Sequence, residues 1–174
     1  MKRVVITGQG AINALGHSAA ETCAAMAAGR CGIGAIDFRD VERLSIRIGG
    51  QVRGYSPEDH FNRQQIALYD RFTQFALLAA REAVAQAGLS FMGELSQRSG
   101  VVLGCSGGGV NTLDDNYRTV YEEGKNRVHP FVVPKLMNNA AASHVSMEHN
   151  LRGPGFTVAT ACASSNHAMG LAFQ

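Results

Sequence analysis

The chain has 174 residues, of which 45% are hydrophobic, 7% aromatic and 17% charged. This length allows one domain or one lobe of a larger fold, and the apolar content excludes a disordered chain. Sixteen Lys and Arg against fourteen Asp and Glu give a formal net charge of +2, which offers no support for a broad nucleic-acid-binding face.

The elements of the first half alternate between strand and helix patterns, which predicts an α/β fold with a mostly parallel sheet. Apolar residues predict a strand at 3–8. The S-x-x-E pattern of Ser18 and Glu21 predicts the start of a helix that stops at Gly29. Alternating residues predict an exposed strand at 46–53.

The longest helix is predicted from Asp70, its N-cap, to Gly88. Apolar residues recur there at steps of three and four, which indicates one buried stripe. The stripe consists of Phe72, Phe75, Ala76, Ala79, Ala80, Ala83 and Ala87.

The second half is predicted to follow the same alternation. In order, the patterns predict a short buried strand at 100–104, a polar helix at 113–123, a loop at 124–133, a helix at 135–149, a turn at 153–155, a strand at 156–159 and a helix from about Ala163.

Cys162 lies between this last strand and helix, with the small residues Ala161 and Ala163 on either side. A strand, a tight turn and a helix form the geometry of a nucleophile elbow, which presents one side chain. The positive end of the helix dipole would favour the thiolate over the thiol, which titrates near ~8.5 when free. On the local pattern alone, an ordinary buried cysteine is an equally good interpretation.

The histidines offer no clear partner for this thiol. His167 follows by five residues, which places it about 140° around the helix, so we expect a packed or interface residue. His144 and His149 do not share a helix face either. The remaining three, which we expect to be solvated, are His17, His60 and His129.

The spacing of the cysteines and histidines also limits which metals and cofactors this chain could bind. The four cysteines include no C-x-x-C pair, which excludes zinc-ribbon and thioredoxin-like sites and predicts free thiols. We expect no metal and no cofactor. No signal-peptide pattern and no membrane-length apolar run is evident in this sequence, so we expect a cytoplasmic protein.

Two glycine-rich segments have alternative interpretations. Gly8 and Gly10 follow the first predicted strand, but Asn13 stands where G-x-G-x-x-G needs its third glycine, and no Walker-type lysine motif is present. A nucleotide-binding module is therefore disfavoured. The run at 104–109 is either a turn that needs glycine or the wall of a narrow channel.

Taken in order, these segments resemble the β-ketoacyl-[acyl carrier protein] synthases, which are thiolase-like condensing enzymes. The elongating synthases are the most similar. The segments that carry the resemblance are 3–10, 70–72, 100–104, 130–134, 138–139, 153–154 and, most specifically, Thr160-Ala161-Cys162-Ala163.

The resemblance implies an architecture and a missing part. Residues 1–174 would form the N-terminal half of a five-layered αβαβα fold. The C-terminal half, in which the family places two catalytic His and a Lys, has no counterpart in these residues. We therefore expect the 174-residue chain by itself to be inactive in condensation. The run Ser164-Ser165-Asn166 is similar to that of synthases of specialised fatty acids, including nodulation-type enzymes.

The resemblance also implies a reaction in fatty-acid biosynthesis and the residues that serve it. Cys162 would accept an acyl group from acyl carrier protein, and a malonyl-carrier thioester would then condense with it in a homodimeric enzyme. The implied substrate-binding residues are Gly107, Phe131 and Val133, and the implied carrier-docking residues are Arg63, Lys125 and Arg127. The alternative is a non-catalytic chain-length or dimerisation partner on the same half-fold. It is disfavoured because such partners typically lack the active cysteine.

Overall fold

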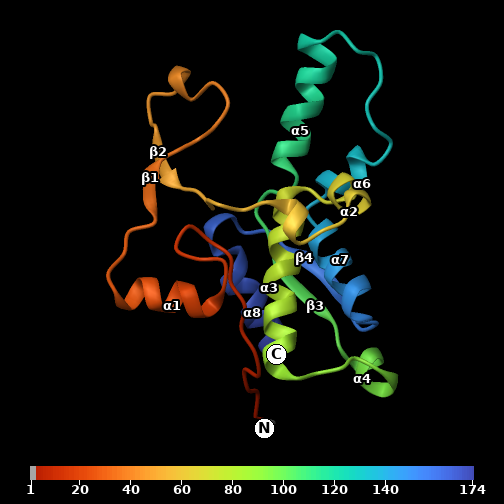
Figure 1. Cartoon of the computed structure of the whole chain (residues 1–174). Helices are drawn as coiled ribbons and strands as arrows, with labels where there is room; N and C mark the ends of the chain where they lie inside the picture. Colours follow the sequence, from red (N-terminus) through yellow and green to blue (C-terminus); the bar gives the residue numbers. More distant parts are fainter. Residues whose placement is uncertain (1–2) are drawn as a thin grey trace. The chain divides into compact units, whose positions relative to one another are not determined.

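The computed structural model describes residues 3–174, which divide into two compact units (Figure 1). The larger unit comprises residues 3–5, Pro57–Leu77 and Leu89–Gln174, and the smaller unit comprises Ile6–Ser56 and Leu78–Gly88. The long helix α3 (Arg71–Ala87) contributes residues to both units. None of the helices in the described range is both long enough and apolar enough to cross a membrane.

The smaller unit contains α1 (Ala19–Ala27), the 3-10 turn η1 (Val41–Arg43) and an antiparallel pair of strands, β1 (Ile33–Ala35) and β2 (Ile48–Gly50). The strand predicted at 46–53 therefore forms only at its centre.

Helix α1 begins and ends where the sequence predicts. The Ser18 hydroxyl accepts a hydrogen bond from the Glu21 N–H at 3.1 Å, and Gly29 follows the helix with a φ of +63°. The Glu21 carboxylate accepts from the N–H of His17 at 2.7 Å, one residue earlier than a capping box requires. Glu82 of α3 also accepts from the Ala19 N–H at 2.9 Å, so a carboxylate lies at the positive end of α1.

The strand predicted at 3–8 is not formed. The structure assigns no strand to these residues, and Ile6 is 91% exposed. A strand needs a neighbour to satisfy its N–H and C=O groups, and no strand within residues 3–174 pairs with this segment.

The larger unit is centred on a parallel pair of strands, β3 (Val101–Gly104) and β4 (Gly155–Val158). Two helices pack against the pair, α7 (Ala140–His149) and α8 (Ser164–Phe173) (Figure 1). The prediction that 100–104 forms a buried strand is only partly correct, because β3 is half-exposed along its length. Two strands and two helices within this chain do not cover both faces of a parallel sheet.

The remaining elements of this unit are short. They are η2 (Pro57–Asp59), α2 (Arg63–Leu68), α4 (Gly93–Arg98), α5 (Val110–Tyr117), the π-helical turn η3 (Arg118–Glu122), α6 (Val132–Leu136) and the 3-10 turn η4 (Ala161–Ala163).

Two helix predictions in this unit need correction. The helix expected at 135–149 is two helices, α6 and α7, and α6 begins inside the predicted loop. Pro134 is tolerated there because it occupies the first turn of α6, where N–H groups have no helical acceptor. The polar helix expected at 113–123 starts earlier, at Val110, and ends in the π-helical turn.

The buried side of α3 also differs from the predicted stripe. The stripe residues are only half-buried, whereas Thr73, Gln74 and Leu77 are buried. Periodicity finds the apolar face, but a polar side chain can be buried beside it if it is hydrogen-bonded. The amide of Gln74 meets this condition, because it donates to the Tyr69 carbonyl at 3.1 Å, whereas the buried Thr73 hydroxyl has no hydrogen-bond partner among the described residues.

Asp70 links the starts of two helices, α3 and α5. The side chain is 4% exposed, and its Oδ1 accepts from the N–H of Phe72 at 3.3 Å. Its Oδ2 accepts from the N–H of Thr112 at 2.9 Å and from the Thr112 hydroxyl at 2.5 Å. The predicted N-cap of α3 therefore also satisfies the first turn of α5, which no local pattern indicates.

Replacing Asp70 by Ala should lower the free energy of unfolding by about 3 kcal/mol, because a helix cap is lost and the buried Thr112 donors lose their acceptor. Urea unfolding measures this change. Asp114→Ala is the matched control, since Asp114 forms only a partly exposed ion pair with Arg118, and it should cost no more than about 0.5 kcal/mol. Equal losses in the two variants would contradict the link.

Gly104, the last residue of β3, allows α8 to lie directly on the sheet. A Cβ at this position would overlap the carbonyl carbon and oxygen of Ser164. Gly107, three residues further on, has no atom within 4 Å of the position of a Cβ. Gly104 is therefore required by packing, whereas Gly107 leaves open space beside the chain.

Gly104→Ala should destabilise the fold by about 2 to 3 kcal/mol, because the added methyl group meets backbone that cannot rotate away. Gly107→Ala should change the stability by no more than about 1 kcal/mol. Thermal and urea unfolding of both variants, compared with the parent, check this difference. A tolerated alanine at position 104 would show that α8 is free to move off β3.

Candidate active site

The carboxyl ends of β3 and β4 bring the two candidate segments to one edge of the sheet. The strands pair in parallel register as far as Gly104 and Val158, and the Cys105 N–H donates to the Val158 carbonyl at 3.0 Å. The glycine-rich segment follows β3, and the turn with Cys162 follows β4. Ligands of α/β sheets bind beyond this edge, so the topology brings Gly107 and Cys162 to the same side.

The turn between β4 and α8 has the predicted elbow geometry. After β4, Thr160 has a φ of −141° and a ψ of 46°, and Ala161 has a φ of +50°. The turn η4 then leads into α8. A left-handed residue other than glycine costs about 1–2 kcal/mol, and Ala161 accepts this cost directly before Cys162.

Ser164 holds this turn together. Its hydroxyl accepts from the Thr160 N–H at 2.9 Å and donates to the Ala161 carbonyl at 2.7 Å. Each bond contributes about 0.5–1.5 kcal/mol, so the pair is comparable with the strain at Ala161. The sequence analysis did not find this role. The available signal was a hydroxyl two residues after the cysteine, at the start of a helix.

Cys162 is exposed at the start of this helical segment. The hydrogen bonds found among the described residues of the turn use the N–H groups of Thr160, Ala163 and Ser164, and none uses that of Cys162. The thiol and an N–H group of one residue are thus both at the positive end of α8, where anions are stabilised. Cys23, Cys31 and Cys105 are free as well.

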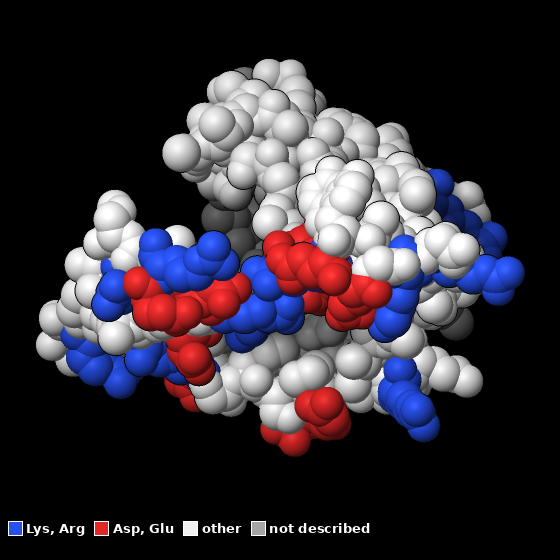
Figure 2. Space-filling model, turned by 90° about the horizontal axis from the view of Figure 1, so that it is seen from above, with Lys and Arg blue, Asp and Glu red and all other residues white. Residues whose placement is uncertain are grey.

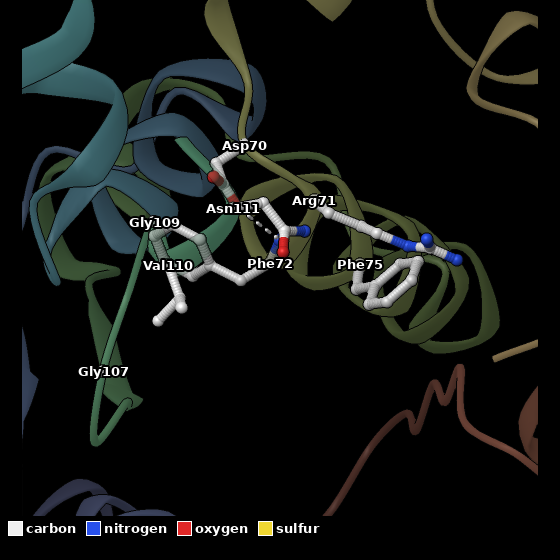
Figure 3. A pocket seen from close by; sticks show the side chains of 8 residues that line it. All are labelled: Asp70, Arg71, Phe72, Phe75, Gly107, Gly109, Val110 and Asn111. Atoms are coloured by element: carbon white, nitrogen blue, oxygen red, sulfur yellow. Dashed lines mark hydrogen bonds between the residues drawn. The ribbon is translucent and has the colours of Figure 1, made fainter. Parts of the chain in front are cut away.

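Gly107 lines an open pocket of about 220 Å³ (Figure 3). In the close-up, the Phe72 ring and the Val110 side chain border the space beside the loop that carries Gly107. The Asn138 side-chain oxygen accepts from the Gly108 N–H at 2.7 Å and fixes this loop, a role that the sequence analysis did not find. The lining residues are Asp70, Arg71, Phe72, Phe75, Gly107, Gly109, Val110 and Asn111.

Phe131 lines a second pocket of about 200 Å³, together with His129 and Lys135. Val133, on α6, is exposed and lines neither pocket. Within this chain the structure therefore does not bring Gly107, Phe131 and Val133 into one pocket.

The three predicted docking residues are exposed basic side chains on two separate segments. Arg63 is the first residue of α2, while Lys125 and Arg127 lie in the loop after η3. The Lys125 ammonium, 65% exposed, pairs with the Glu123 carboxylate at 2.6 Å.

The histidines lie in varied surroundings. The His144 ring lies against Tyr69, with ring centroids 4.5 Å apart and planes inclined by 58°, and its burial lowers its pKa below the usual value. His167 is exposed, so the expectation of a side chain packed within this chain is wrong. His17 is also bonded, with its Nε2 2.8 Å from the Arg53 carbonyl oxygen.

Gly8 and Gly10 are packing residues rather than a phosphate loop. A Cβ at either position would overlap a carbonyl oxygen of α3, that of Ala83 or that of Ala79. The close contact with the backbone of α3 explains why both positions are glycine, so a bound nucleotide is not needed to explain them. In residues 3–174, no group of three or more His, Cys, Asp or Glu side chains is arranged to hold a metal ion.

Comparisons with known proteins agree with this geometry. The family model for the β-ketoacyl synthase N-terminal domain matches residues 1–174. The 3-oxoacyl-[acyl-carrier-protein] synthase 2 of Staphylococcus aureus (strain N315) is 36% identical over 173 residues, which are 99% of this chain and 42% of that protein. Nodulation protein E of Rhizobium sp. (strain N33) is 42% identical over 168 residues, 97% of this chain and 42% of its own length.

A solved structure supports the same assignment. The ishigamide ketosynthase/chain length factor superimposes with a TM-score of 0.83 at 25% identity, over 95% of this chain and 42% of that chain. The chain thus spans less than half the length of the proteins that it matches. It has the α/β fold of the N-terminal half of a thiolase-like enzyme, and it belongs to the β-ketoacyl synthase family.

Proposed function

We propose that this chain supplies the nucleophile of a condensing acyltransferase, a 3-oxoacyl-[acyl carrier protein] synthase of fatty-acid biosynthesis. The observation that carries the proposal is the exposed Cys162 at a strained turn between a parallel strand and a helix. The name of the Staphylococcus aureus relative supports the substrate class.

The first step would be acyl transfer to Cys162. Its thiolate attacks the thioester carbonyl of an acyl carrier protein, the carbon–sulfur bond to the carrier breaks, and the carrier leaves as a thiolate that takes a proton from water. The developing oxyanion needs N–H donors. The N–H of Cys162 would be one of them, since no bond of the turn described above uses it.

The second step would be decarboxylative condensation. A malonyl-carrier thioester loses carbon dioxide, its carbanion attacks the acyl-Cys162 carbonyl, and the thiolate leaves. The product is a 3-oxoacyl thioester two carbons longer. We expect two His and a Lys from a C-terminal half of the synthase to drive this step, and a cytoplasmic homodimer to be the working form, with no metal or cofactor.

The acyl chain would extend from Cys162 towards Gly107, on the same edge of the sheet. Gly107 leaves its pocket open, so a larger residue there would shorten the accepted chain. Phe131 and Val133, on and beside α6, stay proposed substrate contacts in the assembled enzyme.

The carrier protein would dock on Arg63, Lys125 and Arg127, because acyl carrier proteins are acidic. Figure 2 shows that both basic and acidic side chains are exposed on the face that it draws. Docking would therefore depend on a few well-placed charges rather than on a uniform field.

A chain-length or dimerisation partner is the second candidate. The name of the ishigamide protein includes a chain length factor, so the fold alone does not separate the two roles. Cys162 favours the ketosynthase, because a partner without chemistry has no need for a nucleophile at a strained turn.

Cys162 should be modified by iodoacetamide at least about tenfold faster than Cys23 and Cys31, because only Cys162 lies at a helix start. Peptide mass spectrometry of folded protein after limited labelling measures the three rates. Cys23 and Cys31 serve as internal controls, since both are exposed. Equal rates would remove the electrostatic argument for the nucleophile.

With acyl carrier thioester, the full-length protein should form an acyl adduct on Cys162, and the Cys162→Ser variant should not. We expect the 174-residue chain by itself to be acylated slowly and not to condense, because the proposed His and Lys are not in it. Efficient condensation by this chain would contradict that assignment.

Reversing the charge of both Lys125 and Arg127 to Glu should raise the apparent KM for carrier-linked substrate about tenfold and leave kcat nearly unchanged. Steady-state kinetics at low salt measures the change. Arg98→Glu is the control, because Arg98 is exposed and pairs with an acid as Lys125 does, but it lies on α4, outside the loop after η3. An unchanged KM would exclude the two residues from the docking surface.

A further inference from the structure

We propose that Ser164 is the positioning residue of the Cys162 nucleophile, and that its hydroxyl closes a clamp around the turn that carries the thiol. The inference rests on the proposed function, because it assigns a role within the same site. It goes beyond that function because it assigns control of the thiol direction to a residue that takes no part in the chemistry.

The hydroxyl of Ser164 is placed to act as such a clamp. Ser164 is only 4% exposed, and its oxygen both accepts from the Thr160 N–H and donates to the Ala161 carbonyl. These bonds span residues 160–164, with Cys162 at the middle of the span. One buried hydroxyl therefore fixes Thr160 and Ala161, the two residues that precede the cysteine.

Ser164 is itself held by the sheet. Its carbonyl group lies against Gly104, where a Cβ would overlap it, and its N–H donates to the Ala161 carbonyl. The backbone of Ser164 is thus fixed on β3, and its side chain transmits this fixed position to Thr160 and Ala161. The neighbouring Ser165 is exposed, so the two adjacent serines have different surroundings.

Loss of the Ser164 hydroxyl would change the conformation of the turn, because this side chain is buried and contributes little to the surface. Ala161 holds a φ of +50°, and the Thr160 N–H has Ser164 Oγ as its acceptor. Without that acceptor, the strained residue can relax towards ordinary backbone angles. The thiol and the N–H of Cys162 then lose their fixed direction towards a bound thioester, while the groups that bind the substrate stay in place.

The test uses three variants of the full-length protein, Ser164→Thr, Ser164→Val and Ser164→Ala. Thr and Val have nearly the same shape, and only Thr keeps a hydroxyl. Single-turnover acylation of Cys162 by acyl carrier thioester gives a rate constant and a half-saturating concentration. Iodoacetamide labelling across pH gives the plateau reactivity of the thiolate and the apparent pKa of the thiol.

We expect Ser164→Val and Ser164→Ala to lower the acylation rate constant by about tenfold to a hundredfold, with half-saturation nearly unchanged, since misplacement of a reacting group by about 1 Å has effects of this size. Ser164→Thr should stay within about threefold of the parent. Ser165→Ala, the adjacent control, should match the parent. The plateau reactivity towards iodoacetamide should also change in the Val and Ala variants and not in the Thr variant.

Equal acylation rates for the Thr and Val variants would overturn the clamp. If the Val variant does not fold, as judged by near-ultraviolet circular dichroism, the comparison of Thr with Ala decides in the same way. Failure of the proposed function looks different. The parent would then form no acyl-Cys162 at all, whereas a dependence of the labelling profile on the Ser164 hydroxyl would still support the clamp.

Discussion

The contact between Gly104 and Ser164 is the constraint on which the candidate site depends. Because residue 104 has no side chain, the first turn of α8 lies directly on the end of β3. The parallel register of β3 and β4 then brings the glycine-rich loop and the cysteine turn to one edge. A larger residue at this point would move the helix away from the sheet and the nucleophile away from the loop.

The cysteine turn combines strain with compensation. Ala161 adopts a left-handed conformation, and two hydrogen bonds of one buried hydroxyl offset the cost. Such a turn stays in one conformation because its surroundings fix it from both sides. This arrangement suits a nucleophile, since an exposed thiol is useful only if it keeps a constant direction.

Carboxylates accept from N–H groups at the starts of three other helices, α1, α3 and α5. Asp70 serves α3 and α5 in the larger unit, and Glu82 serves α1 in the smaller unit. In both cases one acid joins segments far apart in sequence. At the start of α8 a neutral hydroxyl holds the turn, as the Ser18 hydroxyl and the Asn62 amide cap α1 and α2. An acid at that position would oppose a thiolate, whereas a hydroxyl leaves the positive end of the helix for the cysteine.

The sequence by itself determined the local elements and indicated Cys162 as the residue proposed to be the nucleophile. The caps at Ser18 and Asp70, the helix α3 up to Gly88, the strand β3 and the strand-turn-helix around Cys162 follow from nearest-neighbour chemistry, and the ordered motifs indicated the family. Short-range rules were sufficient because each of these features has a local signal, such as a capping side chain, an apolar run or a turn residue, even where its partner lies far away in the sequence.

Tertiary structure alone decided the features that need a distant partner. The apolar run at 3–8 stays unpaired, the buried side of α3 includes Thr73 and Gln74, and Gly107 and Phe131 line separate pockets. Asp70 accepts a hydrogen bond from Thr112, 42 positions away, and position 104 must be glycine because the backbone of Ser164 lies against it. No local pattern carries such information, because strand pairing, burial and close backbone contact are properties of two segments and not of one.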